Sequence, residues 1–410
     1  MKKSMKTLWR TFVSITLATA LVSGCSSAGG GSQTTGQTSA AKPADTPTGQ
    51  AAAESAVQET DGQKAAQSDD SEYFADMSEL GDEYYNALPY KDVLALDKGE
   101  IKIDGKDEIV IGFSQTAFNH PWRSEMINSA RSEINRHPNV KMVVTDGNVD
   151  IVKQSSDIRD LIAQQVDAIV MSPVESAGLV GAVEEATAAG IPVIVLDRDI
   201  FTDKRTVFIG QSNVTMGAAV AERMVERLIE KNGAPKGKIL EITGLMGSSP
   251  AIDRQAGMMS VLEQYPEIEI LATGDGEWIR EPAVKLMEDW LIAYDEIDAV
   301  YSHAEESSWG AQLAIMRAGR SNEGIMHFTM DGSNEGFVSV KKGEFEADGN
   351  YSPYIGDLGV RAALYTLMGK EIDGLTDYEY GKKLVLADLP VVVPENAEEW
   401  IGKGWGDYKD

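Results

Sequence analysis

The sequence predicts an α/β protein with two doubly wound parallel sheets, one in each of two lobes. Short, nearly continuous apolar runs alternate with longer segments whose apolar residues recur at helical spacing. Such runs are typical of strands that are buried on both faces of a parallel sheet. The alternation begins at Ile109 and restarts near Lys238. The folded region is longer than one hydrophobic core usually holds, which also favours two lobes.

Four strands and three helices are predicted in the first lobe. The strands are expected at Ile109–Phe113, Lys141–Thr145, Asp167–Met171 and Pro192–Leu196. The helices are expected at Trp122–Arg136, Ile151–Gln164 and Ala177–Ala189. Strands and helices that alternate in this way form βαβ units, with helices covering both faces of the sheet.

The second lobe repeats this rhythm. Its strands are expected at Lys238–Thr243, Glu269–Thr273, Ala299–Ser302 and Met326–Met330. Its helices are expected at 250–264, 281–293 and 306–318. The acidic, tyrosine-rich segment 71–108 precedes the first strand, and we expect it to be an N-terminal extension that packs on the first lobe.

The start of the chain predicts export from the cytoplasm. A basic head is followed by an apolar run from Leu8 to Val22, too short for the roughly 20 residues that span a bilayer. Residues 1–24 are therefore a predicted signal peptide. Cys25, the only cysteine, follows Val-Ser-Gly and resembles the lipobox of bacterial lipoproteins, which implies a lipid anchor. Residues 25–70 are rich in small and polar residues and are expected to form a flexible linker.

The net charge of −28 argues against nucleic acid as a partner, because phosphates require basic surfaces. It also argues against electrostatic docking on anionic lipid. The sequence contains no motif that calls for a cofactor or a metal.

Polar side chains follow the predicted strands, where open parallel sheets bind ligands. The ligand-binding candidates are Gln115, His120, Trp122, Arg123, Asp197, Arg198, Arg254, Trp278 and Asp331, with weaker candidates at Asp275, His303, Glu305 and Asn350. Aspartates accept and arginines donate hydrogen bonds in fixed geometry, which suits the hydroxyls of a sugar. Tryptophan rings suit its apolar faces. These residues predict a sugar site between the lobes.

The chain from about 109 to 395 resembles the type I periplasmic binding proteins of sugar importers, in particular the ribose-binding and galactofuranose-binding branch. The segments that carry the resemblance are 111–115, Trp122-Arg123, Asp146-Gly147, 166–169, Ser172-Pro173, 190–193, 196–198, 251–254, Gly274-Asp275 and 330–332.

The resemblance implies a three-stranded hinge with crossings near 212, 351 and 380. The first lobe would then comprise 109–212 and 352–379, and the second 213–351 and 380–410. By position, Trp122 and Trp278 would stack on the sugar, and Gln115 and His120 would lie at the rim. The hydroxyl ligands would be Arg123, Asp197, Arg198, Arg254 and Asp331. The implied protein is a monomeric lipoprotein outside the cytoplasm that captures a monosaccharide and passes it to the permease of an ABC-type importer.

One position departs from the family, which commonly carries a hydrogen-bonding residue where this chain has Ala304. One sugar contact is therefore absent or supplied by His303. A sensor that presents a ligand to a membrane kinase, or binds a non-sugar ligand, remains the main alternative. A glycoside-processing enzyme is disfavoured, because arginines beside Asp197 and Asp331 are expected to lower the pKa of both carboxyls.

A calcium loop is also disfavoured. Asp146, Asn148 and Asp150 match the first ligand positions of an EF-hand, but Ile151 replaces the glycine that its turn needs.

Overall fold

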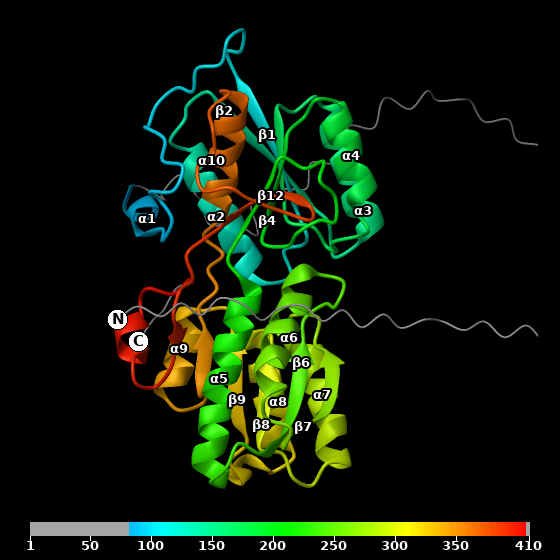
Figure 1. Cartoon of the computed structure of the whole chain (residues 1–410). Helices are drawn as coiled ribbons and strands as arrows, with labels where there is room; N and C mark the ends of the chain where they lie inside the picture. Colours follow the sequence, from blue (N-terminus) through cyan, green and yellow to red (C-terminus); the bar gives the residue numbers. More distant parts are fainter. Residues whose placement is uncertain (1–81, 407–410) are drawn as a thin grey trace, which may run out of the picture. The chain divides into compact units, whose positions relative to one another are not determined.

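The computed structural model describes residues 82–406, and these residues form two lobes, each built on its own sheet (Figure 1). The first sheet has seven strands in the order β11-β12-β5-β4-β3-β1-β2. The second has six strands in the order β13-β10-β9-β8-β6-β7. The predicted fold class, two doubly wound parallel sheets, is confirmed. The predicted signal peptide, Cys25 and the whole predicted linker, 25–70, lie outside the described residues, as do residues 71–81 of the predicted extension.

The first lobe contains the predicted strands and helices and several further elements. Its strands are β1 (Ile109–Gln115), β2 (Val140–Asp146), β3 (Ala168–Met171), β4 (Val193–Leu196), β5 (Val207–Gly210), β11 (Thr376–Tyr378) and β12 (Gly381–Val385). Its helices are α1 (Asp82–Ala87), α2 (Pro121–Ile134), α3 (Ile151–Ala163), α4 (Val180–Ala188) and α10 (Gly356–Leu367).

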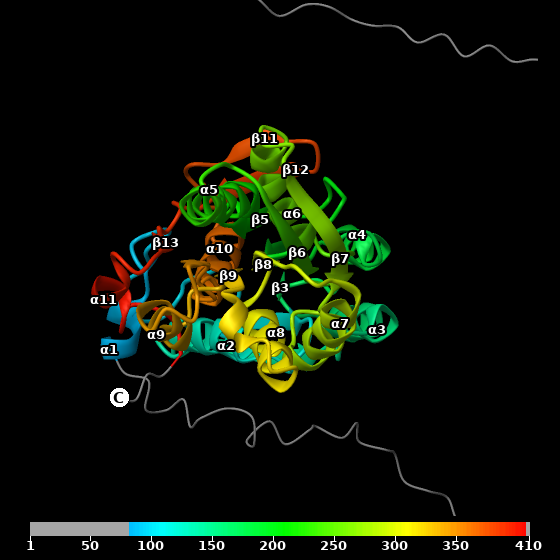
Figure 2. The ribbon, with the colours of Figure 1, turned by 90° about the horizontal axis from the view of Figure 1, so that it is seen from below.

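Alternating side chains of the first sheet pack on opposite helix layers. Ile111 and Phe113 lie in one apolar cluster with residues of α2 and α10. Ile169 and Val195 lie in another cluster with residues of α3 and α4. Figure 2 shows α3 and α4 together on one side of this lobe, away from α2 and α10. Burial on both faces explains why these strands read as continuous apolar runs.

The second lobe repeats this design. Its strands are β6 (Gly237–Thr243), β7 (Ile268–Asp275), β8 (Ala299–Ser302), β9 (Met326–Met330), β10 (Ala347–Gly349) and β13 (Val391–Val392). Its helices are α5 (Asn213–Asn232), α6 (Ser249–Leu262), α7 (Arg280–Ala293), α8 (Glu305–Arg317), α9 (Asn334–Lys341) and α11 (Ala397–Trp400), with a short 3-10 turn, η3 (Ser321–Glu323). Leu240 and Val300 face α7 and α8, whereas Ile239 and Tyr301 face α5 and α6.

The chain passes between the two sheets three times: from β5 to α5, from β10 to α10 and from β12 to β13. The predicted third crossing near 380 is wrong. Strand β12 pairs in parallel with β5 of the first sheet, so residues 381–385 belong to the first lobe rather than the second. The pairing persists because Leu384 and Leu386 are buried and the Leu386 N–H donates to the Gly210 carbonyl at 3.0 Å. The crossing therefore lies between 386 and 390.

Residues 82–108 pack on the first lobe. Tyr90, Leu96 and Ile101 belong to the same apolar cluster as β1. The buried Arg361 of α10 donates to the carbonyls of Tyr90 and Lys91. Between residues 82 and 406, no helix has both the length and the apolar character that a bilayer span requires.

Candidate functional site

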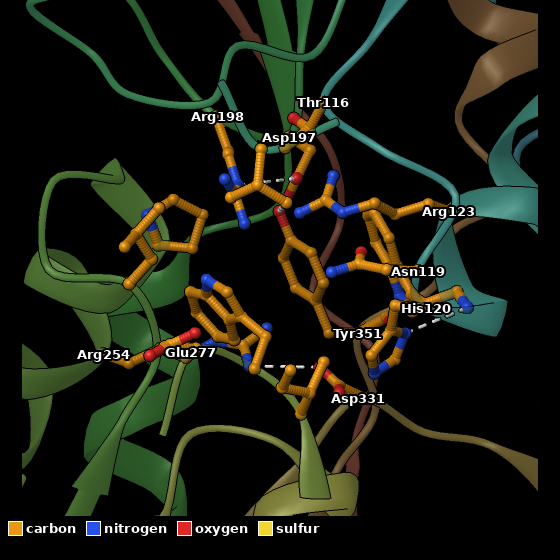
Figure 3. A pocket seen from close by; sticks show the side chains of 16 residues that line it. Thr116, Asn119, His120, Arg123, Asp197, Arg198, Arg254, Glu277, Asp331 and Tyr351 are labelled. Atoms are coloured by element: carbon orange, nitrogen blue, oxygen red, sulfur yellow. Dashed lines mark hydrogen bonds and ion pairs between the residues drawn. The ribbon is translucent and has the colours of Figure 1, made fainter. Parts of the chain in front are cut away.

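A cavity of ≈ 130 Å³ lies where the strand ends of the two sheets face each other. This volume is well above the roughly 10–15 Å³ that a single water molecule needs, so the cavity can hold more than one water. The lining residues are Thr116, Asn119, His120, Trp122, Arg123, Val149, Asp197, Arg198, Leu245, Pro250, Arg254, Glu277, Trp278, Ile279, Asp331 and Tyr351. The lining carries three arginines and three acidic residues, so their formal charges balance (Figure 3). This balance suits a neutral polar molecule.

The two lobes touch beside this cavity. The Ser176 N–H, after β3, donates to the Gly247 carbonyl at 3.1 Å. The Asp199 N–H, after β4, donates to the Ser249 hydroxyl at the start of α6, at 2.8 Å. These contacts join strand-end loops of the first lobe to those of the second.

Several lining residues have an uncommon backbone conformation. Asp197, Glu277, Trp278 and Asp331 have φ values of 63°, 54°, 68° and 144°, a region that residues other than glycine rarely adopt. Such strain persists only where the surroundings impose it, and it concentrates at functional sites. Asp197 follows β4 in the left-handed conformation, so its side chain does not continue the alternation of side-chain directions along that strand.

The three arginines are held from behind, which leaves donors for a ligand. Arg198 donates through Nη1 to the Val174 carbonyl at 2.8 Å, and its buried Nε has no hydrogen-bond partner. Arg254 donates through Nε to the Asn213 side chain at 2.9 Å and through Nη1 to Asp331 at 3.1 Å. Arg123 donates to the Gln115 side chain at 3.3 Å.

Burial raises the pKa of Asp331 to about 7, although Arg254 acts in the opposite direction. Arg254 does lower the pKa of this carboxyl, as expected, but the expected net decrease is wrong, because burial raises the pKa more. The loss of hydration outweighs the ion pair because Asp331 is almost fully enclosed. Asp331 can thus exchange a proton near neutral pH.

His120 is a neutral donor at the cavity. Its Nδ1 accepts the Trp122 N–H at 3.1 Å and so caps the start of α2. Burial, Arg123 and Arg198 lower the pKa of His120 to about 3. A neutral ring whose Nδ1 accepts must carry its proton on Nε2, and this atom is buried without a partner.

The two tryptophans lie in different surroundings. Trp278 packs against Gly244, where a Cβ would stand 2.1 Å from the indole, and its Nε1 is buried without a partner. The guanidinium carbons of Arg198 and Arg254 lie 5.6 and 5.4 Å from its ring centroid. Trp122 instead stacks on Tyr351, with centroids 5.8 Å apart and an interplanar angle of 17°.

Eight predicted residues line the cavity: His120, Trp122, Arg123, Asp197, Arg198, Arg254, Trp278 and Asp331. The other five do not. Gln115 is buried behind Arg123, and Asn350 lies against Gly332. The His303 ring contacts Glu241 at 3.2 Å, so it does not replace the contact missing at Ala304.

The remaining two candidates, Glu305 and Asp275, also make hydrogen bonds within the protein instead of lining the cavity. Glu305 accepts the Ser333 N–H at 2.7 Å in the interior. Asp275 is exposed and accepts the Glu277 N–H at 2.8 Å.

Eight lining residues were not among the predicted ligands: Thr116, Asn119, Val149, Leu245, Pro250, Glu277, Ile279 and Tyr351. Thr116 and Asn119 lie between Gln115 and His120, so their position after a predicted strand could have identified them as lining residues. Tyr351 comes from a crossing segment, which carries no such signal.

The calcium-like loop has a structural role. Asp150 caps α3 through the N–H groups of Val152 and Lys153, and Asp146 accepts the Asn148 N–H at 2.8 Å. Among the described residues, no group of three or more His, Cys, Asp or Glu side chains is placed to hold a metal ion.

Known proteins share this architecture. The ribose import binding protein of Bacillus subtilis (strain 168) is 30% identical over 268 residues, which cover 65% of this chain and 84% of that protein. The galactofuranose-binding protein of Escherichia coli (strain K12) is 28% identical over 306 residues, covering 72% and 91%. The solved fructose binding periplasmic domain of a hybrid two component system is 31% identical, with a TM-score of 0.65, covering 72% of this chain and 94% of that one.

The resemblance noted in the sequence is thereby confirmed. Residues 111–371, most of the two lobes, match the family described as periplasmic binding protein domain. Relatives and solved structures of this kind are named for solutes that they bind. The chain therefore belongs to the periplasmic binding protein domain family, in its sugar-binding branch.

Proposed function

We propose that this protein captures one monosaccharide in the cavity between its lobes and delivers it to an ABC-type importer. The observation that carries the proposal is the charge-balanced cavity, where arginines and aspartates of both lobes meet aromatic rings. Sugar hydroxyls can accept from arginine and donate to carboxylate, and both kinds of hydrogen bond are charge-assisted. The ribose import and galactofuranose-binding relatives support the same ligand class.

Binding operates through closure of the lobes. Arg198 and Asp197 belong to the first lobe, whereas Arg254 and Asp331 belong to the second. A ligand that contacts all four has a higher affinity for the closed arrangement and shifts the population toward it. The three crossing segments absorb the movement as a hinge.

A thermal-shift screen of pentoses and hexoses tests the ligand class, because a specific ligand stabilises only the folded state. We expect one sugar, or a few related ones, to raise the unfolding temperature at millimolar concentration. Failure of every sugar, together with stabilisation by a different class of solute, would contradict the proposal.

We also propose that the mature protein is a monomeric lipoprotein outside the cytoplasm, anchored at Cys25 by lipid alone. The basic head, the short apolar run and the Val-Ser-Gly-Cys junction support export and a lipid anchor. Labelled palmitate should be incorporated by cells that express the wild-type chain. A Cys25→Ser variant should lose the label and leave the membrane fraction.

A ligand sensor is the second candidate, favoured by the similarity to the fructose binding domain of a hybrid two component system. Co-purification in native membranes separates the two, because a permease and its ATPase indicate transport whereas a kinase indicates sensing. We propose no catalytic role, and turnover of a chromogenic glycoside would contradict this.

A further inference from the structure

Tyr351 belongs to neither set of strand-end loops. It lies in the segment that crosses from β10 to α10, and its ring lines the cavity while only 1% of the residue is exposed. Figure 3 shows the ring reaching from this segment toward Asp197, between the labelled groups of both lobes. The Trp122 Nε1 donates to the Tyr351 carbonyl at 3.1 Å and fixes the backbone here.

The direction of each hydrogen bond around its hydroxyl can be deduced. A guanidinium has no acceptor, so the Asn213 atom that receives the Arg254 Nε is the amide oxygen, at 2.9 Å. The Asn213 nitrogen then faces the Tyr351 hydroxyl at 3.3 Å and donates to it. The tyrosine proton is left for Asp197, whose Oδ1 accepts it at 3.1 Å.

The phenol hydroxyl therefore bridges a carboxylate of the first lobe and an amide of the second. This is the set of contacts that a hydroxyl of the ligand would make if the phenol were absent. Both oxygens of Asp197 accept protein donors: Oδ1 accepts from Tyr351 at 3.1 Å and Oδ2 from the Ser172 hydroxyl at 3.4 Å. The ring also fills volume beside Trp122 and Arg254, whose guanidinium carbon lies 4.9 Å from the ring centroid.

We propose that Tyr351 is a specificity-determining residue that restricts the site to pentoses and excludes the hexoses that carry one further hydroxymethyl group. This inference rests on the proposed function. The ring of Tyr351 forms part of the wall of this cavity of ≈ 130 Å³, so its volume is withdrawn from the ligand. The phenol occupies the space and the hydrogen-bonding partners that the additional group would require.

The test compares matched sugar pairs that differ only in that group in their pyranose forms: D-xylose and D-glucose, L-arabinose and D-galactose, and D-ribose and D-allose. Calorimetry should show that the wild-type protein binds the pentose of at least one pair about tenfold or more tightly than the hexose. Tyr351→Ala should remove this preference, because it vacates the phenol volume and frees Asp197 and Asn213.

One further variant separates volume from hydrogen bonding, a second is a control, and a third replaces the alanine variant. Tyr351→Phe keeps the ring, so it should weaken both sugars of a pair and retain the preference. Tyr354→Phe, in the same crossing segment but outside the cavity, should behave as the wild type. Tyr351→Leu gives the same comparison as the alanine variant if the latter does not fold.

The inference is overturned if the shortened variants keep the pentose preference, or if the wild-type protein binds the hexose of each bound pair as tightly as the pentose. Binding of none of the six sugars by the wild-type protein or any variant also overturns the inference, whereas the proposed function fails only if the wider thermal-shift screen gives no sugar and a different class of solute stabilises the protein.

Discussion

Arg198 is a buried charge whose hydrogen bonding is incomplete. Burial and the neighbouring Arg123 lower its pKa well below the usual value. Asp197 lies 3.8 Å away as an ion-pair partner, and the buried Nε has no hydrogen-bond partner. A buried charge in such surroundings costs stability in the empty protein. A ligand hydroxyl at the cavity would supply the missing acceptor.

Arg198→Ala should therefore weaken sugar binding by at least about 30-fold, the effect of losing one partner of a buried charged contact. Unfolding of the empty protein should occur at the wild-type temperature or slightly above it. Arg159→Ala is the matched control, because it removes an exposed pair with Glu185 in the same lobe. Undiminished sugar affinity in the Arg198 variant would show that the cavity is not the binding site.

We expect Asp331 to release a proton when the sugar binds. Burial raises its pKa to about 7, so this carboxyl titrates in the neutral range. Hydroxyls that donate to this carboxyl favour its ionised form and lower its pKa. Binding near pH 7 should therefore release protons, and affinity should rise between about pH 6 and pH 8.

Calorimetry in buffers of different ionisation enthalpy measures this release directly. Asp331→Asn should bind more weakly and release fewer protons. A binding heat that is independent of the buffer at pH 7 in the wild-type protein would exclude the linkage.

In the second lobe, two buried carboxyls connect α8, β10 and the turn before α9. Glu305 begins α8 and Asp348 lies in β10. Burial and the charge of Asp348 raise the pKa of Glu305 well above its usual value. The two carboxyls accept the N–H groups of Ser333 and Gly332, at 2.7 and 3.3 Å, before α9. The pair thus supports the turn that carries Asp331.

This pair should make the protein less stable as pH rises. Burial raises the pKa of Asp348 to about 7, above its value of about 3.9 in an unfolded chain. The folded state then binds the proton more tightly, so this contribution is complete at low pH and is lost as pH rises through about 7. Asp348→Asn should flatten the decline in unfolding temperature between pH 5 and pH 8. The exposed Asp289→Asn should leave the decline unchanged, and an equal effect of both would refute this account.

Helices α2 and α10 cross at Gly356. A Cβ at this position would stand 1.9 Å from the Met126 carbonyl oxygen, so the helices would have to separate. Gly356→Ala should lower the free energy of unfolding by about 1–3 kcal/mol, as overpacked cores do. Gly181→Ala in α4 meets nothing within 4 Å and should be neutral or slightly stabilising. Urea denaturation of both variants distinguishes the two, and equal stability would contradict the crossing argument.

The sequence predicted the elements whose pattern is local. Strands such as β1 and β8 were identified because burial on both faces leaves continuous apolar runs. Strand β12 was assigned to the wrong lobe because its Lys382 and Lys383 carry no such run, and its place depends on pairing with β5. Helix α5 was not predicted, although Ser212 and Gly233 cap its two ends.

For the site, the strand-end rule located most of the cavity wall but could not orient side chains. His303 and Glu305 lie at the expected strand end yet point into the interior, because partners from other elements hold them there. Tyr351 was missed as a lining residue because its place depends on how both lobes meet the crossing segment. Contacts between elements distant in sequence decide such positions, and a single sequence does not encode them in its local pattern.

At the scale of the whole molecule, the N-terminal extension reaches two of the three crossing segments. The Tyr90 hydroxyl donates to the Ala387 carbonyl at 3.0 Å, in the crossing from β12 to β13. The Tyr84 ring packs edge-on against Tyr354, in the crossing from β10 to α10, with centroids 5.9 Å apart. The extension therefore contacts two of the segments that we propose as the hinge.

Removing the contact between Tyr90 and the third crossing should change affinity at a distance from the ligand. Tyr90→Phe removes the one hydrogen bond from this hydroxyl to the third crossing segment, so we expect sugar affinity to fall by about 2- to 10-fold. Tyr365→Phe is the matched control, because its hydroxyl holds the same extension through the Ala95 carbonyl at 3.1 Å without touching a crossing segment. Small-angle scattering with and without sugar would measure the closed fraction, which should fall at subsaturating sugar in the Tyr90 variant alone. Equal effects of both variants would mean that the extension acts through the stability of the first lobe and not through the hinge.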